Sequence, residues 1–324
     1  MQRKKIYIIG AGQIGSRHLQ GLRSAKIPLD ITAVDASAES LHMAKERYDA
    51  MPEGPIAQKV AYRADIPNKE KIDVAIIATT SFMRADITRE LLGKSEVRYL
   101  ILEKLLFQKK DDYTKIGALL KKKKVKTWVN CSMRMMPFYQ GIKKEMSGQK
   151  ISYVLQGNSS GLVTDLIHHL DFIAFVSGSK HFSLNTALLD KKTKESKRKG
   201  HLEFTGTLIA EFEGGSTGLF RCDADGTTPK VIVILGENRR YIVRELESEA
   251  FVSKAPEWLW EEIPAPVLYQ SQLTNLLAED ILTKGKCDLT PYEESALYHL
   301  QALEPLKKFL NSVSPKKYTH YPFT

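Results

Sequence analysis

The chain has 324 residues, of which 43% are hydrophobic and 27% are charged, and its formal net charge is +10. This length exceeds the usual size of one domain and predicts two, while the composition excludes an intrinsically disordered protein. No apolar run approaches the roughly 18 residues that a membrane-spanning helix needs, and the cysteines at 131, 222 and 287 lie too far apart for a disulfide framework. We therefore expect a cytoplasmic protein without a membrane partner.

Much of the positive charge lies in two lysine-rich runs, 121–126 and 191–199. Neither run has the interleaved aromatic residues or the recognisable motifs of nucleic-acid-binding proteins. We interpret both as solvent-exposed loops and expect no nucleic-acid partner. A weaker alternative is that they attract an anionic small substrate.

The first part of the chain alternates apolar, β-branched runs with helical segments such as 14–25 and 85–94. Strands are expected at 6–10, 31–35, 74–80, 99–104 and 127–130. Runs that are apolar on both faces are typical of buried parallel strands. Residues 1–130 are therefore predicted to form an α/β domain with a doubly wound parallel sheet.

Residues 131–324 follow another pattern. A strand at 151–156 precedes a helix that carries the sequence TDLIHHLDF, and two hairpins are expected to turn at Gly214-Gly215 and near Glu237-Asn238. Thr290 followed by Pro291 and Glu293 predicts the N-cap and first turn of a late helix. The second domain, 131–324, is therefore expected to be α+β with an open, mostly antiparallel sheet.

A glycine-rich loop follows the first predicted strand. Gly10, Gly12 and Gly15 have the G-x-G-x-x-G spacing that allows a tight turn, close approach of a pyrophosphate and close packing of the next helix. Asp35 closes the second strand, where a carboxylate can bind the ribose 2′-hydroxyl of NAD and would repel the 2′-phosphate of NADP. The loop predicts an NAD site, with an S-adenosylmethionine-dependent methyltransferase as the alternative that the loop alone leaves open.

Two further segments carry candidate chemistry. Glu103 and Lys104 end a predicted strand at the edge where open α/β sheets bind ligands. On a helix, Asp165, His168 and Asp171 follow at intervals of three, so one imidazole lies between two carboxylates. A proton-handling histidine fits this pattern better than a metal site, because zinc would need a third ligand that no spacing supplies.

Taken together, GAGQIG, Asp35, the strand end before Ser81, the Glu-Lys dipeptide, the segment Arg134 to Pro137 and IHHLD resemble the Gfo/Idh/MocA family of oxidoreductases. The resemblance implies an N-terminal Rossmann domain, a C-terminal substrate and oligomerisation domain, a homodimer or homotetramer, and oxidation of a sugar, cyclitol or sugar nucleotide at a secondary hydroxyl. The implied catalytic residues are Lys104, His168, Asp165 and Asp171. The implied cofactor contacts are Gly10, Gly12, Gln13, Ile14, Gly15, Asp35, Thr79, Ser81, Glu103 and Lys104, and the implied substrate contacts are Lys104, Arg134, His168 and His169.

The chain departs from the family pattern at several positions. Leu105 replaces the proline of the family's Glu-Lys-Pro motif, Arg84 replaces a frequent histidine, and Thr164 replaces an aspartate that precedes the catalytic histidine by four residues. The segment GLVTDLIH resembles a subgroup of surface-polysaccharide and nonulosonic-acid biosynthesis, with Asp165 in the place of an asparagine. A non-catalytic NAD(H) sensor and a biliverdin-reductase-like activity are the alternatives.

Overall fold

The computed structural model describes residues 2–158 and 161–324. It consists of two compact units, one comprising the chain up to Met135 together with Leu268–Glu293, and the other comprising Met136–Val267 with Glu294–Thr324. The division expected at residue 130 differs from these units because residues 268–293 return to the first. No helix among the described residues is long and apolar enough to cross a membrane.

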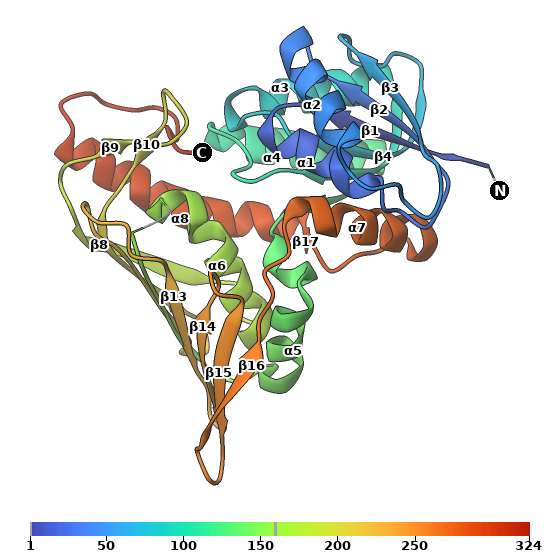
Figure 1. Cartoon of the computed structure of the whole chain (residues 1–324). Coiled ribbons are helices and arrows are strands. Elements are labelled where there is room, and N and C mark those ends of the chain that lie inside the picture. The colour runs from blue at the N-terminus through green and yellow to red at the C-terminus, as the bar shows by residue number, and fades with distance from the viewer. Residues whose placement is uncertain (1, 159–160) are drawn as a thin grey trace. The chain divides into compact units, whose positions relative to one another are not determined.

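The first unit is built on a seven-stranded sheet in the order β17-β6-β5-β4-β1-β2-β3, in which only β17 is antiparallel (Figure 1). The expected doubly wound parallel sheet is therefore confirmed. Its strands are β1 (Lys4–Ile9), β2 (Leu29–Val34), β3 (Lys59–Arg63), β4 (Lys71–Ile77), β5 (Glu96–Leu102), β6 (Lys126–Val129) and β17 (Thr290–Pro291). Its helices are α1 (Gln13–Leu22), α2 (Ala38–Asp49), α3 (Ser81–Lys94), α4 (Lys110–Lys123), the 3-10 turn η1 (Ser132–Met135) and α7 (Gln270–Lys284).

Buried aliphatic side chains explain why these strands form the centre of the unit. The last four residues of β1, β4 and β5 are buried on both faces of the sheet. Such strands lose their apolar surface only when helices cover both sides. The sheet therefore brings the carboxyl ends of β1, β4 and β5 to one edge.

The predicted start of the late helix was wrong by one residue. Thr290 and Pro291 form the short strand β17, in which Thr290 pairs with Val129 of β6, and α8 (Tyr292–Val313) begins only after Pro291. The edge of the parallel sheet thus takes the backbone groups that a helix start would otherwise use.

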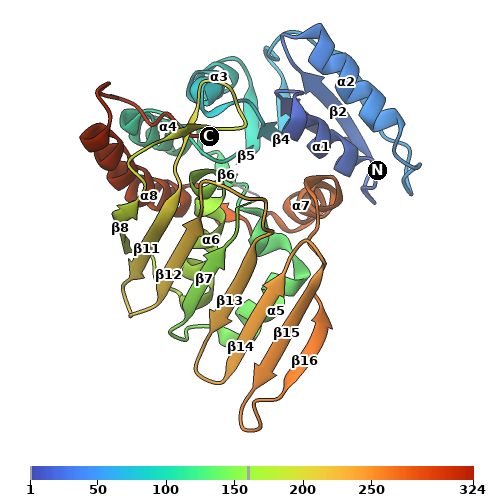
Figure 2. The same ribbon diagram turned by 60° about the vertical axis from the view of Figure 1, so that its left-hand side comes forward.

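The second unit contains an eight-stranded sheet in the order β16-β15-β14-β13-β7-β12-β11-β8, which Figure 2 shows face on. All its neighbours are antiparallel except β7 and β12, and both predicted hairpins are present as β11–β12 and β13–β14. The strands are β7 (Ser152–Gln156), β8 (Phe182–Leu189), β11 (Gly206–Phe212), β12 (Thr217–Cys222), β13 (Val231–Leu235), β14 (Arg239–Arg244), β15 (Glu249–Lys254) and β16 (Trp260–Pro264). A small hairpin, β9 (Lys194–Glu195) and β10 (Leu202–Glu203), stands apart from this sheet.

Helix α6 (Leu162–Ser177) carries the histidine pair and lies against one face of the sheet with α5 (Pro137–Met146), as both views show. Eleven of its sixteen residues are buried, so it is a core helix rather than a surface helix. Gly178 ends it in the left-handed conformation that glycine adopts most easily. The polar side chains of α6 are therefore held on a rigid, buried element.

Candidate active site

The glycine loop after β1 has the shape of a phosphate cradle. Gly10 has φ +93°, and a Cβ on Gly15 would lie 1.7 Å from the carbonyl oxygen of Gly10, so neither position accepts another residue without distortion. A Cβ on Gly12, in contrast, would meet nothing within 4 Å. The loop is therefore closed against the protein at Gly10 and Gly15 and open at Gly12, where a pyrophosphate can approach the backbone.

The N-terminus of α1 and the end of β2 complete this loop. Helix α1 begins at Gln13, so the N–H groups of Gln13 and Ile14 lie in the first turn, where a helix has no internal acceptors. Asp35 follows β2, and its carboxylate accepts hydrogen bonds from the N–H of Ala11 at 2.7 Å and of Ser37 at 2.9 Å. The predicted residues of the dinucleotide site are thus brought together, and they fit such a ligand.

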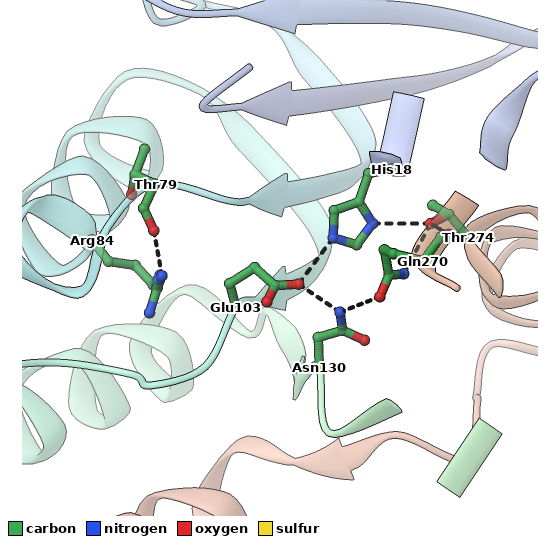
Figure 3. Close-up of polar contacts among 7 residues, drawn as sticks. All are labelled: His18, Thr79, Arg84, Glu103, Asn130, Gln270 and Thr274. Carbon is green, nitrogen blue, oxygen red and sulfur yellow. Dashed lines mark hydrogen bonds and ion pairs between the residues drawn. The ribbon is translucent and has the colours of Figure 1, made fainter. Parts of the chain in front are cut away.

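A buried network holds Glu103 at the end of β5 (Figure 3). Its Oε1 lies 2.9 Å from His18 Nε2 and accepts a hydrogen bond from Asn130 Nδ2 at 2.5 Å. His18 Nδ1 lies 3.0 Å from Thr274 Oγ1, and the Asn130 amide donates to Gln270 at 2.7 Å. The carboxylate next to Lys104 is therefore fixed by His18 of α1 and by Asn130, which follows β6, and α7 in turn holds both of these side chains.

The ionisation of Glu103 follows from this network. Burial alone would raise its pKa, but the hydrogen bond and charge of His18, the hydrogen bond from Asn130 and the charge of Arg84 outweigh burial and lower the pKa to about 2. Glu103 is thus a carboxylate at neutral pH although only 6% of its surface is exposed. Lys104, the next residue, is half-buried, and the peptide bond between Lys104 and Leu105 is cis.

Arg84 links the two loops that follow β4 and β5. It is 1% exposed and donates hydrogen bonds to the carbonyl oxygens of Leu105 and Leu106 in one loop and of Thr79 in the other. Within the described residues, the buried hydroxyl of Thr79 has no hydrogen-bond partner. Ser81 begins α3 and is buried. The loops that carry Thr79 and Lys104 are therefore braced by a single guanidinium group.

In the second unit, Asp165 belongs to a line of charged side chains. Its carboxylate lies 3.5 Å from Lys230 Nζ, which also contacts Glu245 at 2.8 Å, and Tyr139 donates a hydrogen bond to Glu245 at 2.5 Å. Burial alone would lower the pKa of Lys230, but the charges of Asp165 and Glu245 outweigh it and raise that pKa. Lys230 therefore stays protonated and holds Asp165 near the surface of α6.

The two histidines of α6 have different surroundings. His169 is 1% exposed, and its Nδ1 lies 2.6 Å from the hydroxyl of Tyr153 on β7, whereas His168 is half-buried. Asp171 is fully buried. Arg134, in the η1 turn of the first unit, is also buried. His168 is thus the more accessible of the two imidazoles.

Glu203 caps α6 from a distant part of the chain. It accepts hydrogen bonds from the N–H groups of Val163 at 2.5 Å and Thr164 at 3.1 Å and from the Thr164 hydroxyl at 2.8 Å. A Cβ on Gly161 would lie 2.1 Å from Glu203 Oε2, so a glycine is required for the carboxylate to approach. Thr164, which stands where the family has an aspartate, is used in this cap. Among the described residues, no group of three or more His, Cys, Asp and Glu side chains could hold a metal ion.

Comparison with known families agrees with the geometry of the first unit. Residues 4–131 match the model of the Gfo/Idh/MocA family, an oxidoreductase family with an NAD-binding Rossmann fold. Residues 4–131 belong to this family. No curated protein is significantly similar in sequence to the chain.

Solved structures share the fold of the chain along most of its length. Levoglucosan dehydrogenase, in complex with NADH and levoglucosan, is 15% identical, with a TM-score of 0.71 over 97% of this chain and 100% of its own. UDP-N-acetylglucosamine 3-dehydrogenase GnnA from Acidithiobacillus ferrooxidans is 11% identical, with a TM-score of 0.68 over 97% and 100%. Biliverdin reductase from Synechocystis, in complex with biliverdin and NADP+, is 13% identical, with a TM-score of 0.68 over 94% and 98%. At these identities the likeness shows the fold alone.

Sequence reasoning missed the partners that support the expected residues. In the Gfo/Idh/MocA domain, His18 follows Gly15 by three residues and shares the buried face of α1 with Leu19 and Leu22, a pattern that could have revealed it. Asn130 ends the predicted strand that follows the one ending near Glu103, so a contact between these two side chains could have been predicted. Lys230 and Glu203 carry no local signal, because their partners on α6 lie 65 and 39 residues away in the chain.

Proposed function

We propose that the protein is an NAD-dependent oxidoreductase that acts on a secondary alcohol, or on the corresponding ketone, of a sugar, a cyclitol or a sugar nucleotide. The observation that carries the proposal is the glycine cradle, open at Gly12, beside the braced strand end that presents Lys104. The buried, unpaired hydroxyl of Thr79 at the same strand edge supports it, because a bound cofactor would supply the missing partner.

Asp35 favours NAD over NADP. Its carboxylate is held by two backbone N–H groups at the end of β2, so it cannot turn away from a ribose without losing both hydrogen bonds. A 2′-phosphate at that ribose would be repelled by the carboxylate, whereas a 2′-hydroxyl can donate to it. No arginine follows Asp35 directly to accept the phosphate.

The proposed roles of the other residues follow from their chemistry. Nicotinamide, when bound, accepts or supplies the hydride. In the oxidation direction we assign His168 as the base that takes the hydroxyl proton, and Lys104 as the donor that holds the hydroxyl oxygen. Asp165 and Asp171, three residues on either side of His168 along α6, are assigned to orient the imidazole and stabilise its protonated form.

Two expected substrate contacts need separate roles. His169 is hydrogen-bonded to Tyr153 inside the core, and we propose that it positions α6 rather than touching the substrate. Arg134 remains the proposed substrate contact of the η1 turn. The likeness of the fold to two enzymes that are named for a sugar and a sugar nucleotide supports a substrate of that class.

A non-catalytic NAD(H) sensor is the competing proposal, and the replacements at Leu105 and Thr164 favour it. A biliverdin reductase shares the fold as well.

Titration of the protein with NADH and with NADPH, followed by fluorescence, tests the cofactor site. Turnover of levoglucosan, inositol, UDP-N-acetylglucosamine and biliverdin then tests the chemistry. We expect tighter binding of NADH and turnover of a sugar-like compound; NADH binding without turnover of any compound would favour the sensor.

A further inference from the structure

A cavity of about 460 Å³ lies in the second unit beside the first turns of α6. We call it the hairpin pocket, because the β9–β10 hairpin and its connecting loop contribute to its lining. Its lining includes residues 194–198 and Glu203 of the hairpin, Thr164 and Asp165 of α6, and Thr324. Its volume is within the range of about 300–1,000 Å³ that is usual for small-molecule sites.

The carboxylates of the hairpin pocket are occupied by the protein itself. Asp165 is paired with Lys230, and Glu203 accepts hydrogen bonds from the N–H groups at the start of α6. Glu195 accepts a hydrogen bond from the N–H of Gly200 at 3.2 Å. The negative charges on the lining are therefore engaged in holding the walls.

The cationic side chains of the pocket, in contrast, are mostly not paired with carboxylates of the described residues. Lys194 and Arg198 form no ion pair with any carboxylate in the described part of the chain, and Arg198 donates a hydrogen bond to the Thr324 hydroxyl at 2.9 Å. Lys197 lines the pocket beside them. The pocket thus presents three cationic side chains, of which two lack a carboxylate partner.

The hairpin is also fixed in place rather than loosely solvated. Lys194 and Glu195 pair with Glu203 and Leu202, Ser196 N–H donates to the His201 carbonyl at 2.8 Å, and Leu202 N–H donates to the Pro322 carbonyl at 2.7 Å. A basic run that serves only solubility needs no such anchoring. The anchoring lowers the conformational entropy that the hairpin backbone would lose on binding a ligand.

We propose that the hairpin pocket binds an anionic group of the substrate, either a phosphate or a carboxylate, through Lys194, Lys197 and Arg198. The inference rests on the proposed function, because it extends the substrate from a sugar to a sugar that carries a negative charge. Asp165 joins the two sites, since it lines the pocket and lies three residues before His168 on α6. The lysine-rich run 191–199, interpreted from sequence as an exposed loop, acquires a role at those of its residues that line the pocket.

The test measures binding of anions directly, by calorimetry and without cofactor or turnover. The probes are UDP, glucose 1-phosphate and glucuronate, with glucose as the neutral comparison. The double variant Lys194→Gln/Lys197→Gln removes two charges of the pocket, and Lys191→Gln/Lys192→Gln removes two charges from the same loop outside the lining. We expect at least one anion to bind more tightly than glucose, and the pocket variant to weaken it about 10- to 100-fold.

The outcomes separate the pocket from the cofactor site. Binding of UDP and glucose 1-phosphate alone identifies a phosphate site, and binding of glucuronate alone identifies a carboxylate site; either supports the proposal if the Lys191/Lys192 variant keeps its affinity. Equal losses in both variants, or no preference for any anion over glucose, would overturn it. NADH titration of the same variants reports separately on the proposed function, and we expect it to be unchanged.

Discussion

At the scale of single residues, Asp35 is the side chain that we propose selects NAD over NADP. Asp35→Asn keeps the size and one carbonyl acceptor but removes the charge. We therefore predict that the variant binds NADH more weakly and NADPH more tightly than the unsubstituted protein does. The dissociation constant for NADPH divided by that for NADH should fall by about tenfold or more, which corresponds to about 1.4 kcal/mol.

Fluorescence titration with both cofactors checks this prediction. Asp30→Asn is the matched control, because it makes the same change near the other end of β2. An unchanged preference in Asp35→Asn would remove Asp35 from the cofactor site.

Glu103 gives a prediction about pH. Its pKa is lowered from the ordinary 4.5 to about 2 in the folded chain, so the carboxylate form is bound more favourably in the folded than in the unfolded state. This contribution to stability is fully present above pH 4.5 and is lost as the pH falls toward 2. We predict that Glu103→Gln lowers the free energy of unfolding at neutral pH by about 3–5 kcal/mol, because it breaks the buried pair with His18. The variant should also lose less stability than the unsubstituted protein as the pH falls from 4.5 to 2.

Denaturant unfolding at several pH values measures this effect. Glu96→Gln, an exposed position on the same strand, is the control and is expected to change stability by no more than about 0.5 kcal/mol. Identical unfolding of Glu103→Gln and the unsubstituted protein would mean that the His18 and Asn130 contacts contribute nothing.

His168 carries the proposed proton transfer. His168→Ala is predicted to lower kcat on a turned-over substrate by about 10²- to 10⁴-fold, the usual contribution of general acid–base catalysis. The affinity for NADH should stay the same, because the imidazole is assigned no cofactor contact. Steady-state kinetics beside NADH titration separates the two, with the exposed His42→Ala as control. Wild-type turnover by His168→Ala would exclude the assignment.

At the scale of elements, α6 depends on the close approach of Glu203 to Gly161. Gly161→Ala would place a Cβ 2.1 Å from the Glu203 carboxylate, and we predict a loss of about 1–3 kcal/mol of stability from the overpacked cap. Gly141→Ala in α5 is the contrasting control, because a Cβ there meets nothing within 4 Å and should stabilise the helix by up to about 1 kcal/mol. Thermal unfolding of both variants measures the difference, and a neutral Gly161→Ala would contradict the cap.

The elements that could be predicted from sequence are those with strong local patterns. The apolar runs near Ile8, Ile76 and Ile101 specified β1, β4 and β5, and the glycine pairs and turns specified the hairpins of the second unit. Strand β3 was not predicted, because its residues are exposed or half-buried at the edge of the sheet and lack an apolar run. The short strand β17 could not be predicted, since the pairing of Thr290 with Val129 joins residues 161 positions apart.

At the scale of the whole molecule, local sequence patterns pointed to the proposed site residues but not to the residues that hold them in place. Glycine spacing and strand ends pointed to Gly12, Asp35 and Lys104 because these positions obey local rules. The return of residues 268–293 to the first unit supplies Gln270 and Thr274 to the Glu103 network, and no local pattern announces such a long-range contact.

Hydride transfer itself is the most direct measurement. The protein would be incubated with NADH that carries deuterium at C4 of the nicotinamide and with ketone forms of neutral and anionic sugars, and the products analysed by mass spectrometry. The proposed oxidoreductase predicts deuterium on the former carbonyl carbon of at least one sugar, and a greatly reduced rate with His168→Ala. Tight NADH binding without deuterium in any product would contradict it.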